Sequence, residues 1–450
     1  MTHNIACCYL THNHPDVVKR VLGQVLTSYD ENGIDIYMYD SSTSDDTKEY
    51  IDKLIAGGAK NLFYVPVDAG IGGDGKMLQV LKGYGLQKEY DYIWPNKDRS
   101  YVTKATAGLI QAESHKNYQC LYIDTRIPIA SERRDYKPVY GREEFFREFG
   151  WQTTSWETMI IHTDLLLHTI TWDIFEAQYA LGGQQNFNQS LTVFGGLALV
   201  DDAKVRVLSY REAELRNDFS TSSDWIIATF LLWGERWPKA INSLPACYDA
   251  DKEKVIKDGN MHPNVFGSVD NLILLEQKGF LNTEVWNRYR AQWDKLSDIP
   301  VRYVEAVLAR DYGKVMQMAM EDLKAAFAAQ DYDLAYYIAV RTYCISNITG
   351  NTAYWMLRTC MEVFRNELDA KKTPGIMYHV NYYQDLVDKY QQIKFYLRRI
   401  EYDIPVPEDD MLAYLGEHHI TSEFICAVIE KECINWTKIL DYWRNIGYEG

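Results

Sequence analysis

Short apolar runs alternate with helical patterns through the first hundred residues, and this alternation is the feature that most limits how the chain can fold. Strand-like runs cover residues 5–10, 34–39, 62–67 and 90–95, and helical patterns follow at 15–26, 46–56 and about 75–86. A strand, a helix and a second strand in this order form a βαβ unit, whose two strands lie parallel. We therefore predict an α/β fold with a mainly parallel sheet for the N-terminal region.

Each of the four predicted strands ends at a polar turn. These turns cover residues 11–15 (THNHP), 39–47 (YDSSTSDDT), 68–75, which is rich in glycine, and 96–100 (NKDRS). Ligands of parallel sheets bind beyond the carboxyl ends of the strands, so the turns mark one edge of the sheet as the predicted binding edge. In the second turn, Ser44 or Asp45 can cap the next helix. Asp40 lies earlier, at the end of the strand, where a carboxylate can accept a hydrogen bond from the N3–H of a uracil or from a ribose hydroxyl.

The first turn contains two histidines, His12 and His14. Two neighbouring imidazoles can bind a metal ion, but Pro15 favours the first position of a helix, which makes an ordinary exposed turn the simpler interpretation. We therefore predict that both histidine side chains face solvent.

The chain is acidic, with 47 Lys and Arg against 63 Asp and Glu in 450 residues, a formal charge of −16. Binding a phosphate polymer depends on clustered cations, so nucleic acid is not an expected partner. The longest apolar run, residues 225–233, is too short to cross a bilayer. We expect a cytoplasmic protein, either free or bound peripherally at the inner membrane face. The eight cysteines are scattered without a CxxC pair, which predicts buried free thiols.

The pattern changes near residue 266. From residue 268 onward the chain carries helical periodicity, with few strand signals, at 301–328, 333–348, 353–366, 382–399 and 422–446. This change predicts an α/β domain over residues 1–266 and an all-α accessory domain over residues 267–450. The apolar stripes of these helices suit a domain core or a dimer face, so acceptor binding and homo-oligomer formation are the two roles considered for the second domain.

The first two turns, in their order and spacing, resemble a known family. A strand with THNHP and a helix, a strand with DSSTSDDT and a helix, and a third strand with a Gly-rich turn are similar to the N-terminal half of bacterial family 2 glycosyltransferases with the GT-A fold. In that family the two stretches usually read P-T-Y-N-R-P and V-D-D-G-S-T-D-D-T. The resemblance covers residues 4–110 well and extends loosely to residue 265.

This resemblance implies an enzyme of the hexosyltransferase type. Such an enzyme moves a sugar from a nucleotide-diphosphate donor, with a UDP-sugar as the first choice, to a hydroxyl of a surface glycan, a glycolipid or a glycoprotein. The family's usual chemistry inverts the anomeric carbon. The expected partners are therefore the nucleotide-sugar donor and a glycan, lipid-linked or protein acceptor.

The resemblance also assigns nucleotide-sugar-binding residues. Thr11 and Asn13 look like the residues that flank the nucleotide, and Asp40 looks like the acid that reads the base. Ser42 stands where the family commonly has Gly or Ser. Lys76 lies near the family's basic residue at the start of the helix after the third strand, where it would contact the base or a phosphate; a solvated lysine is the alternative.

The family's D-x-D metal motif is incomplete in this chain, because the fourth turn reads Asn96-Lys97-Asp98. In the family, a divalent cation held by carboxylates bridges the two phosphates and neutralises the leaving diphosphate. The resemblance implies that Asp98 holds Mn²⁺ or Mg²⁺, with His262 as a further ligand. The alternative is that Lys97 and Arg99 neutralise the diphosphate without a metal.

Two arginines follow the strand-like run at residues 205–208. A guanidinium at this position could clamp the diphosphate in a bidentate manner, and Arg211 is the candidate, with Arg216 beside it. Surface pairing with Glu212 or Glu214 explains both arginines equally well.

The general base is not identified by the sequence. An inverting transferase needs a group that takes the proton from the acceptor hydroxyl. The family's acidic pair is replaced by amides at residues 184–190 (QQNFNQS). The nearby candidates are Glu176, Asp173, Asp201, Asp202 and Asp224. Asp224 has Trp225 as an aromatic neighbour, although a helix cap is its simpler role.

Two other functions stay open. The incomplete D-x-D motif and the missing acidic pair favour a non-catalytic GT-A-like subunit that binds a glycan or a partner. A sugar nucleotidyltransferase also begins with βαβ units, but it needs a Gly-rich phosphate loop after the first strand, and residues 11–15 contain no glycine.

Overall fold

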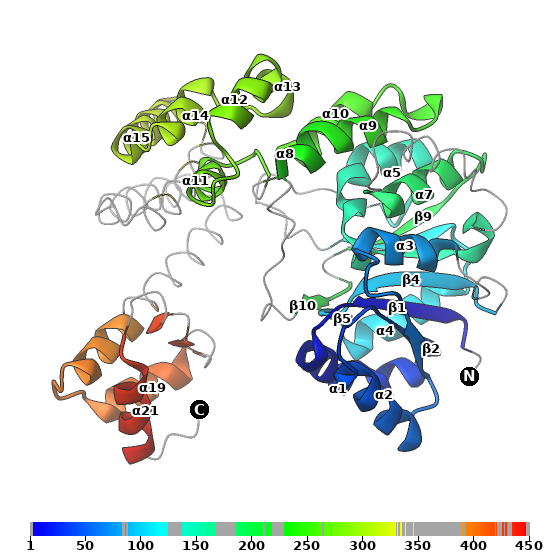
Figure 1. The fold of residues 1–450 in the computed structure, drawn as a ribbon, viewed down its shortest axis with the longest axis horizontal. Helices are drawn as coiled ribbons and strands as arrows, with labels where there is room; N and C mark the ends of the chain where they lie inside the picture. The colour runs from blue at the N-terminus through cyan, green and yellow to red at the C-terminus, as the bar shows by residue number, and fades with distance from the viewer. Residues whose placement is uncertain are drawn as a thin grey trace. The chain divides into compact units, whose positions relative to one another are not determined.

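The computed structural model (Figure 1) describes most of the chain. The described residues are 3–82, 86, 89–124, 137–166, 186–209, 212–217, 229–262, 265–329, 331, 334, 338, 345, 389, 392–418, 420, 425, 426, 428, 429 and 434–446. The chain divides into two compact units. Unit 1 comprises residues 1–127, 134–330 and 340–352, and unit 2 comprises residues 128–133, 331–339 and 353–450.

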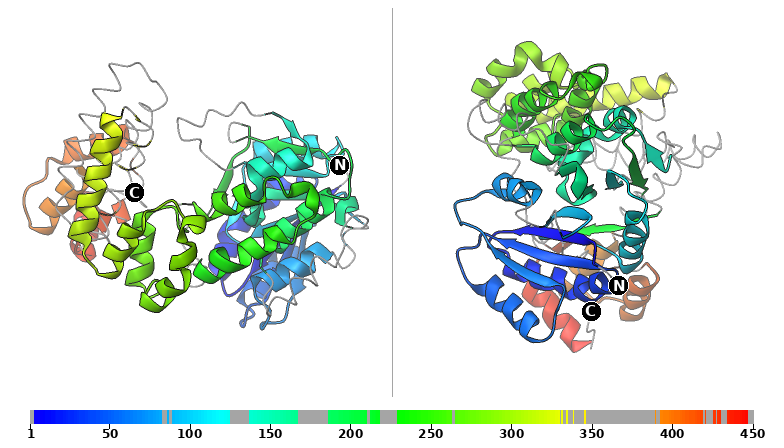
Figure 2. Two further views of the ribbon diagram at one scale, coloured as in Figure 1. Left: turned by 90° about the horizontal axis from the view of Figure 1, so that it is seen from above. Right: turned by 90° about the vertical axis from the view of Figure 1, so that its right-hand side faces the viewer.

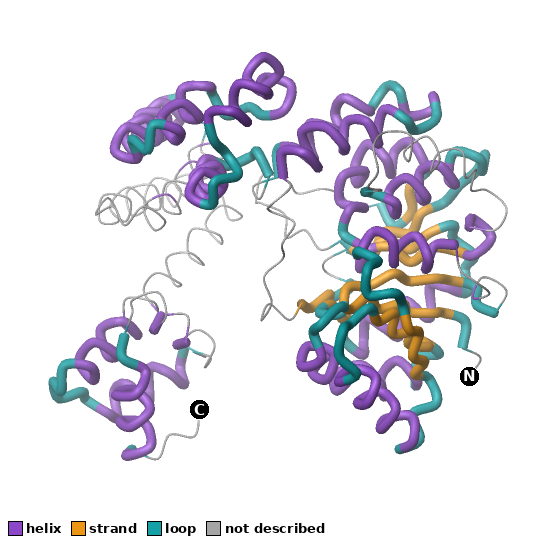
Figure 3. The backbone as a smooth tube through the Cα atoms, in the orientation of Figure 1, coloured by secondary structure: helices purple, strands orange, loops and turns teal. Residues whose placement is uncertain are grey.

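An eight-stranded sheet forms the centre of unit 1 (Figure 3). Its order is β3 (Leu62–Pro66), β2 (Ile34–Asp40), β1 (Ile5–Thr11), β4 (Tyr92–Lys97), β8 (Met159–His162), β6 (Cys120–Ile123), β9 (Val205–Leu208) and β7 (Val139–Tyr140). The longer pairings are parallel, namely β1 with β2 and β4, β2 with β3, and β6 with β9. Strand β8 runs antiparallel to β4 and β6, and β7 runs antiparallel to β9. The predicted α/β fold class with a mainly parallel sheet is confirmed.

Helices cover both faces of this sheet (Figures 1 and 2). Helices α1 (Pro15–Asp30) and α2 (Asp46–Ala56) connect strands that progress in one direction across the sheet, whereas α3 (Gly73–Lys82) leads back from β3 to β4. Right-handed crossovers therefore put α3 on the face opposite α1 and α2. Helix α4 (Lys104–Ser114) contacts α1, and α7 (Asn188–Leu197) contacts α3. The loops between these strands and helices lie at the carboxyl ends of β1, β2 and β4.

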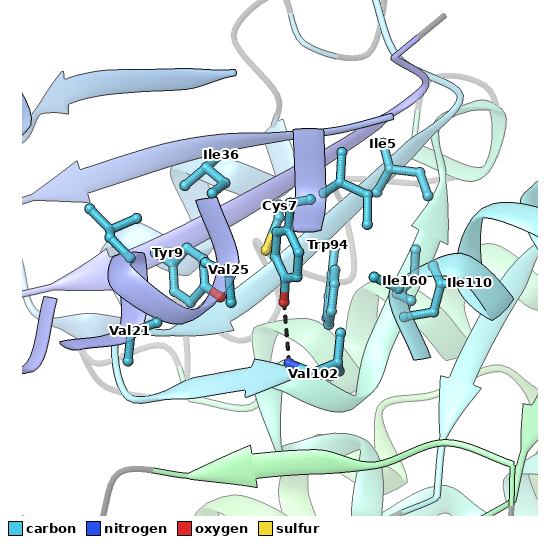
Figure 4. Close-up of a cluster of buried hydrophobic side chains, with 14 of the residues drawn as sticks. Ile5, Cys7, Tyr9, Val21, Val25, Ile36, Trp94, Val102, Ile110 and Ile160 are labelled. Atoms are coloured by element: carbon cyan, nitrogen blue, oxygen red, sulfur yellow. Dashed lines mark hydrogen bonds between the residues drawn. The ribbon is translucent and has the colours of Figure 1, made fainter. Parts of the chain in front are cut away.

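The core of unit 1 lies between the sheet and α1 (Figure 4). Alternate residues of β1, among them Cys7 and Tyr9, face Val21 and Val25 of α1, because side chains of a strand alternate between its two faces. Burial raises the pKa of Cys7 to about 12, which fits an unreactive thiol. The prediction of buried thiols is confirmed for the described Cys7, Cys8 and Cys120 and is wrong for Cys247, which is exposed.

The helices after residue 229 continue unit 1. They are α8 (Thr229–Leu231), α9 (Trp237–Asn242), α10 (Lys252–Asn260), α11 (Val269–Gln277), α12 (Thr283–Tyr289), α13 (Trp293–Leu296), α14 (Val301–Leu308) and α15 (Tyr312–Ala328). Phe266 connects the helices before residue 266 with those after it. Its ring lies 4.8 Å from that of Phe230, and its carbonyl accepts from Ser297 Oγ at 2.7 Å. Unit 1 therefore extends to about residue 330, beyond the predicted boundary at residues 266 and 267. The predicted two-domain assignment stays a prediction.

The elements described in unit 2 are helices. They include α19 (Glu408–Glu417) and α21 (Trp436–Asn445), and a helix covers residues 392–401. A separate apolar cluster, with Leu397, Leu415 and Ile439 among its members, holds these helices together. Within the described ranges of both units, no helix has the length and apolarity that crossing a membrane requires.

Candidate functional site

The predicted binding edge forms at the carboxyl ends of β1, β2 and β4. The strand register places Thr11 beside Asp40, and Leu10 beside Lys97. Thr11 Oγ1 donates to Asp98 Oδ2 at 2.9 Å, and both residues are buried. Three chain segments that are distant in sequence therefore meet at one edge, as the parallel sheet requires.

His14 joins this group. Its Nδ1 lies 2.9 Å from the same oxygen, Asp98 Oδ2, and this hydrogen bond raises the pKa of the imidazole. The prediction that His14 simply faces solvent is wrong, because the start of α1 places the ring against the end of β4. His12 is more exposed, and its Nδ1 lies 2.9 Å from the carbonyl oxygen of Ser41.

Asp40 is held by donors from the second turn and from β3. Its Oδ1 accepts from the backbone N–H of Ser42 at 2.8 Å and from the Ser42 hydroxyl, and its Oδ2 accepts from Tyr64 Oη at 3.1 Å. These bonds fill both acceptor positions of Oδ1 and one of the two on Oδ2. Asp40 is only 3% exposed. Among the described residues, no second donor reaches Oδ2, so one acceptor position of this buried carboxylate is available to a ligand.

The first and second turns are tied together by Asn13. Its backbone adopts a left-handed φ of 57°, which asparagine tolerates better than most residues. In this conformation its N–H donates to Ser42 Oγ at 2.8 Å, and its Oδ1 accepts from the N–H of Thr43 at 2.9 Å. The expected cap from Asp45 is not formed, since its side chain makes no capping hydrogen bond to α2. The second turn is fixed by Asn13 and Asp40 instead.

Lys76 is buried beneath the binding edge. Its ammonium donates to the carbonyl oxygen of Thr11 at 2.5 Å and to Ser41 Oγ at 2.8 Å, and only 3% of the residue is exposed. Burial lowers the pKa of Lys76, while the charges of Asp98 and Asp40 act to raise it. The alternative of a solvated lysine is therefore wrong. Lys76 places a positive charge between the ends of β1 and β2.

Glu157 neutralises one of the two cations that flank Asp98. Lys97 Nζ lies 2.9 Å from Glu157 Oε2, and the Glu157 carbonyl accepts from Trp94 Nε1 at 2.9 Å. The ammonium of Lys97 is thus already paired with a buried carboxylate, which disfavours the alternative in which it neutralises a diphosphate. Sequence reasoning missed Glu157, because no motif marks a residue in a short 3₁₀ turn that reaches β4 from residues 156–158.

Sequence reasoning also missed a second carboxylate, Asp74, which lies in the first turn of α3. Its Oδ2 accepts from Asn186 Nδ2 at 2.8 Å, and its carbonyl accepts from Asn188 Nδ2 at 3.0 Å. The guanidinium of Arg236 donates to Asn186 Oδ1. Burial raises the pKa of Asp74 to about 6, although the Asn186 hydrogen bond and the Arg236 charge both act to lower it. Two of the amides predicted to replace an acidic pair, Asn186 and Asn188, therefore contact an acid from another element, Asn186 through its carboxylate and Asn188 through its backbone carbonyl.

Three of the predicted site residues, Glu176, Arg211 and Asp224, lie outside the described residues. Arg216 is exposed and pairs with Glu214 at 2.8 Å, which confirms the surface pairing for that arginine. His262 lies in the turn after α10, with its ring 5.0 Å from that of Trp151. Among the described residues, no group of three or more His, Cys, Asp or Glu side chains is arranged to hold a metal ion.

No family model and no curated protein matches this chain. Among solved structures, the chain is similar to TarS residues 1–349 of S. aureus, with 14% identity and a TM-score of 0.39 over 76% of this chain and 90% of that one. It is similar to the mannosyltransferase PcManGT of Pyrobaculum calidifontis in complex with GDP-Man and Mn²⁺, with 13% identity and a TM-score of 0.35 over 69% of this chain and 87% of that one. A galactosyltransferase, LgtC, in complex with donor and acceptor sugar analogs, matches 46% of this chain and 74% of its own, with 13% identity and a TM-score of 0.29. The function of this chain is therefore inferred from its own residues.

Proposed function

We propose that this protein is a glycosyltransferase that moves a sugar from a nucleotide-diphosphate donor to an acceptor hydroxyl, with inversion. The observation that carries this proposal is the meeting of Thr11, Asp40, Lys76 and Asp98 at the carboxyl ends of parallel strands. A UDP-sugar is the first choice of donor. A surface glycan, a glycolipid or a glycoprotein is the proposed acceptor.

Each residue of this edge has a proposed role toward the donor. The free acceptor position of Asp40 Oδ2 would take a hydrogen bond from the N3–H of a uracil or from a ribose hydroxyl. Asn13 and Ser42 hold the two turns that would flank the nucleoside. Lys76 lies behind the turns, where its ammonium makes the potential more favourable for a diphosphate.

Asp98 is the residue proposed to hold Mn²⁺ or Mg²⁺. Its two described hydrogen bonds, from Thr11 and His14, both go to Oδ2, and these bonds orient the carboxylate while Oδ1 is left to coordinate. Magnesium sites commonly use one or two carboxylates together with substrate phosphates, so a single carboxylate fits the group. The bound cation would neutralise charge on the leaving diphosphate. His262 stays a proposed further ligand.

Residues 267–450, which divide between the two units, are proposed to have an accessory role in acceptor binding or in homo-oligomer formation. The net charge of −16 over the whole chain does not suit nucleic acid as a partner. A cytoplasmic location is also part of the proposal. The second candidate function is a non-catalytic GT-A-like subunit, favoured by the single carboxylate of the Asn96-Lys97-Asp98 turn.

Replacing Asp40 by alanine is expected to weaken nucleotide binding by about 10-fold or more, since a hydrogen bond to a charged group contributes about 1.5–3 kcal/mol. The measurement is the thermal shift of wild type and variant with UDP, GDP, TDP and CMP, each with and without Mn²⁺. UDP should stabilise the wild type most. Asp52→Ala, an exposed carboxylate on α2, is the control and should behave as wild type. Absence of a shift with every nucleotide would favour the non-catalytic subunit.

Replacing Asp98 by alanine is expected to abolish stimulation of turnover by Mn²⁺, because the variant loses the one carboxylate of this turn. The measurement is UDP release from a UDP-sugar as Mn²⁺ is titrated. Binding of UDP without metal should change by about threefold at most, or about 0.6 kcal/mol. Unchanged metal stimulation in Asp98→Ala would place the metal elsewhere.

A further inference from the structure

The carboxylate of Asp74 has no role in the donor site described above. We propose that Asp74 is the general base of this transferase, the group that takes the proton from the acceptor hydroxyl. This inference rests on the proposed function. It assigns a catalytic residue where the sequence identified no general base, with Glu176 and Asp224 among the candidates.

Contacts connect Asp74 to the end of β4. The neighbouring Gly73 lies against the indole of Trp156, so closely that a Cβ at this position would come 2.7 Å from Trp156 Cη2. Glu157, the next residue after Trp156, pairs with Lys97 in the turn that contains Asp98. Asp74 is thus joined to the binding edge through the packing of residues 156–158. The half-exposed ring of Trp156 also offers an aromatic face of the kind on which sugars stack.

The same helix connects Asp74 to the donor side of the edge. Lys76, two residues further along α3, reaches the carbonyl oxygen of Thr11 at the end of β1. Residues two apart on a helix point in different directions, so the Lys76 side chain faces β1 while the Asp74 carboxylate faces Asn186, which precedes α7. The first turn of α3 therefore carries a cation toward the proposed diphosphate and, on the half-buried Asp74, a carboxylate toward Asn186.

The hydrogen bonds of Asp74 suit a base. Its Oδ2 is fixed by Asn186, which is itself held by Arg236, whereas none of the hydrogen bonds between described residues engages Oδ1. Arg236 is the charged group that acts on Asp74 from the neighbouring helices, and α7 carries no titratable side chain. Lys76 on α3 is bonded to Thr11 and Ser41, and Lys97 on β4 is paired with Glu157. A pKa of about 6 leaves Asp74 ionised at pH 7 and more basic than an ordinary carboxylate.

The acceptor oxygen forms a bond to the anomeric carbon as its proton passes to Asp74 Oδ1. The bond between the anomeric carbon and the diphosphate oxygen breaks, and its electron pair leaves with the nucleoside diphosphate. Asp74 then releases the proton to solvent. Water can take the place of the acceptor, and the products are then free sugar and the nucleoside diphosphate.

The stability of Asp74→Asn distinguishes a catalytic role of Asp74 from a structural one. An acid in the first turn of a helix normally stabilises it by interaction with the helix dipole, and removing the charge then lowers stability. Because the pKa of Asp74 in the folded protein is above its unfolded value, ionisation here costs stability, and this cost appears as the pH rises through about 4 to 6. Asp74→Asn should therefore be as stable as wild type, or more stable, at pH 8.

The experiment measures UDP release from UDP-glucose and from UDP-N-acetylglucosamine, with water as acceptor, together with UDP binding and thermal unfolding at pH 8. In Asp74→Asn we expect kcat to fall by about 10²- to 10⁴-fold with UDP binding unchanged within about twofold. Asp52→Asn, an exposed carboxylate-to-amide change on α2, is the matched control and should keep the wild-type rate. Turnover of Asp74→Asn within about threefold of wild type would overturn the assignment.

The pH dependence of kcat/KM tests the role of Asp74 as a base, because a purely structural role would not set the midpoint of its acid limb. The acid limb of kcat/KM in the wild type should have a midpoint near the pKa of about 6, and Arg236→Gln should shift it upward, because the Arg236 charge lowers the pKa of Asp74. An unmoved limb in Arg236→Gln would contradict the proposal even if Asp74→Asn failed to fold. A wild type that neither binds UDP nor releases it from the sugar nucleotides would refute the proposed function, whereas an active wild type with an active Asp74→Asn refutes only the base.

Discussion

Replacing Lys76 by methionine is expected to weaken UDP binding by about 30-fold or more, because a buried ammonium contributes about 2 kcal/mol through charge-assisted interactions. Lys76 is the cation that acts on both Asp40 and Asp98. Without it, these two buried carboxylates would face an incoming diphosphate with their charges less compensated. Methionine keeps the length of the side chain, so the loss is mainly one of charge and hydrogen bonding.

The same variant is expected to be less stable by about 1–3 kcal/mol, because the carbonyl oxygen of Thr11 and the hydroxyl of Ser41 lose a buried donor. Urea unfolding measures this change, and titration of UDP measures the binding. Lys48→Met is the control, since Lys48 is an exposed lysine on α2 that pairs only with Asp52 in the described contacts, and it should change neither quantity. Wild-type UDP affinity in Lys76→Met would remove Lys76 from the donor site.

The donor side of the site could be predicted because it depends on strand ends. Thr11, Asp40 and Asp98 each follow an apolar run of β-branched or aromatic residues, and parallel strands bring such ends to one edge. The observed strands β1 and β2 begin at the predicted residues and are one residue longer. Local pattern and sheet topology therefore sufficed for this part of the site.

The other side of the site depends on contacts that no local pattern encodes. Asp74 meets Asn186 across 112 residues of sequence, and Lys97 meets Glu157 across 60. Both contacts follow from how residues 156–158 and the start of α7 approach the sheet, and that approach is set by packing. His14 was assigned to solvent for the same reason, because its partner Asp98 is 84 residues away. A buried lysine such as Lys76 has the same sequence signature as an exposed one.

The predicted division near residue 266 shows the same limit for domain organisation. The described residues from 267 to 328 contain helices and no strand, but so do the described residues from 229 to 262, so the observed change to helices comes before residue 266. Phe266 packs on Phe230 and Trp293, so helices on both sides of the predicted boundary share one core. The sequence pattern predicts local secondary structure, whereas the boundary of a unit depends on which side chains are in contact.

Replacing Gly267 by alanine is expected to destabilise unit 1 by about 3 kcal/mol, because a Cβ at this position would lie only 1.7 Å from the carbonyl oxygen of Met261. The backbone, not a flexible side chain, blocks the space, so the turn that carries His262 must move. Urea unfolding measures the loss. The control is Gly23→Ala in the interior of α1, where no atom lies within 4 Å and alanine should stabilise by about 0.5–1 kcal/mol. If Gly267→Ala were as stable as Gly23→Ala, the close approach of Gly267 to the carbonyl oxygen of Met261 would be contradicted, together with the position of His262, whose carbonyl accepts from the Gly267 N–H at 3.2 Å.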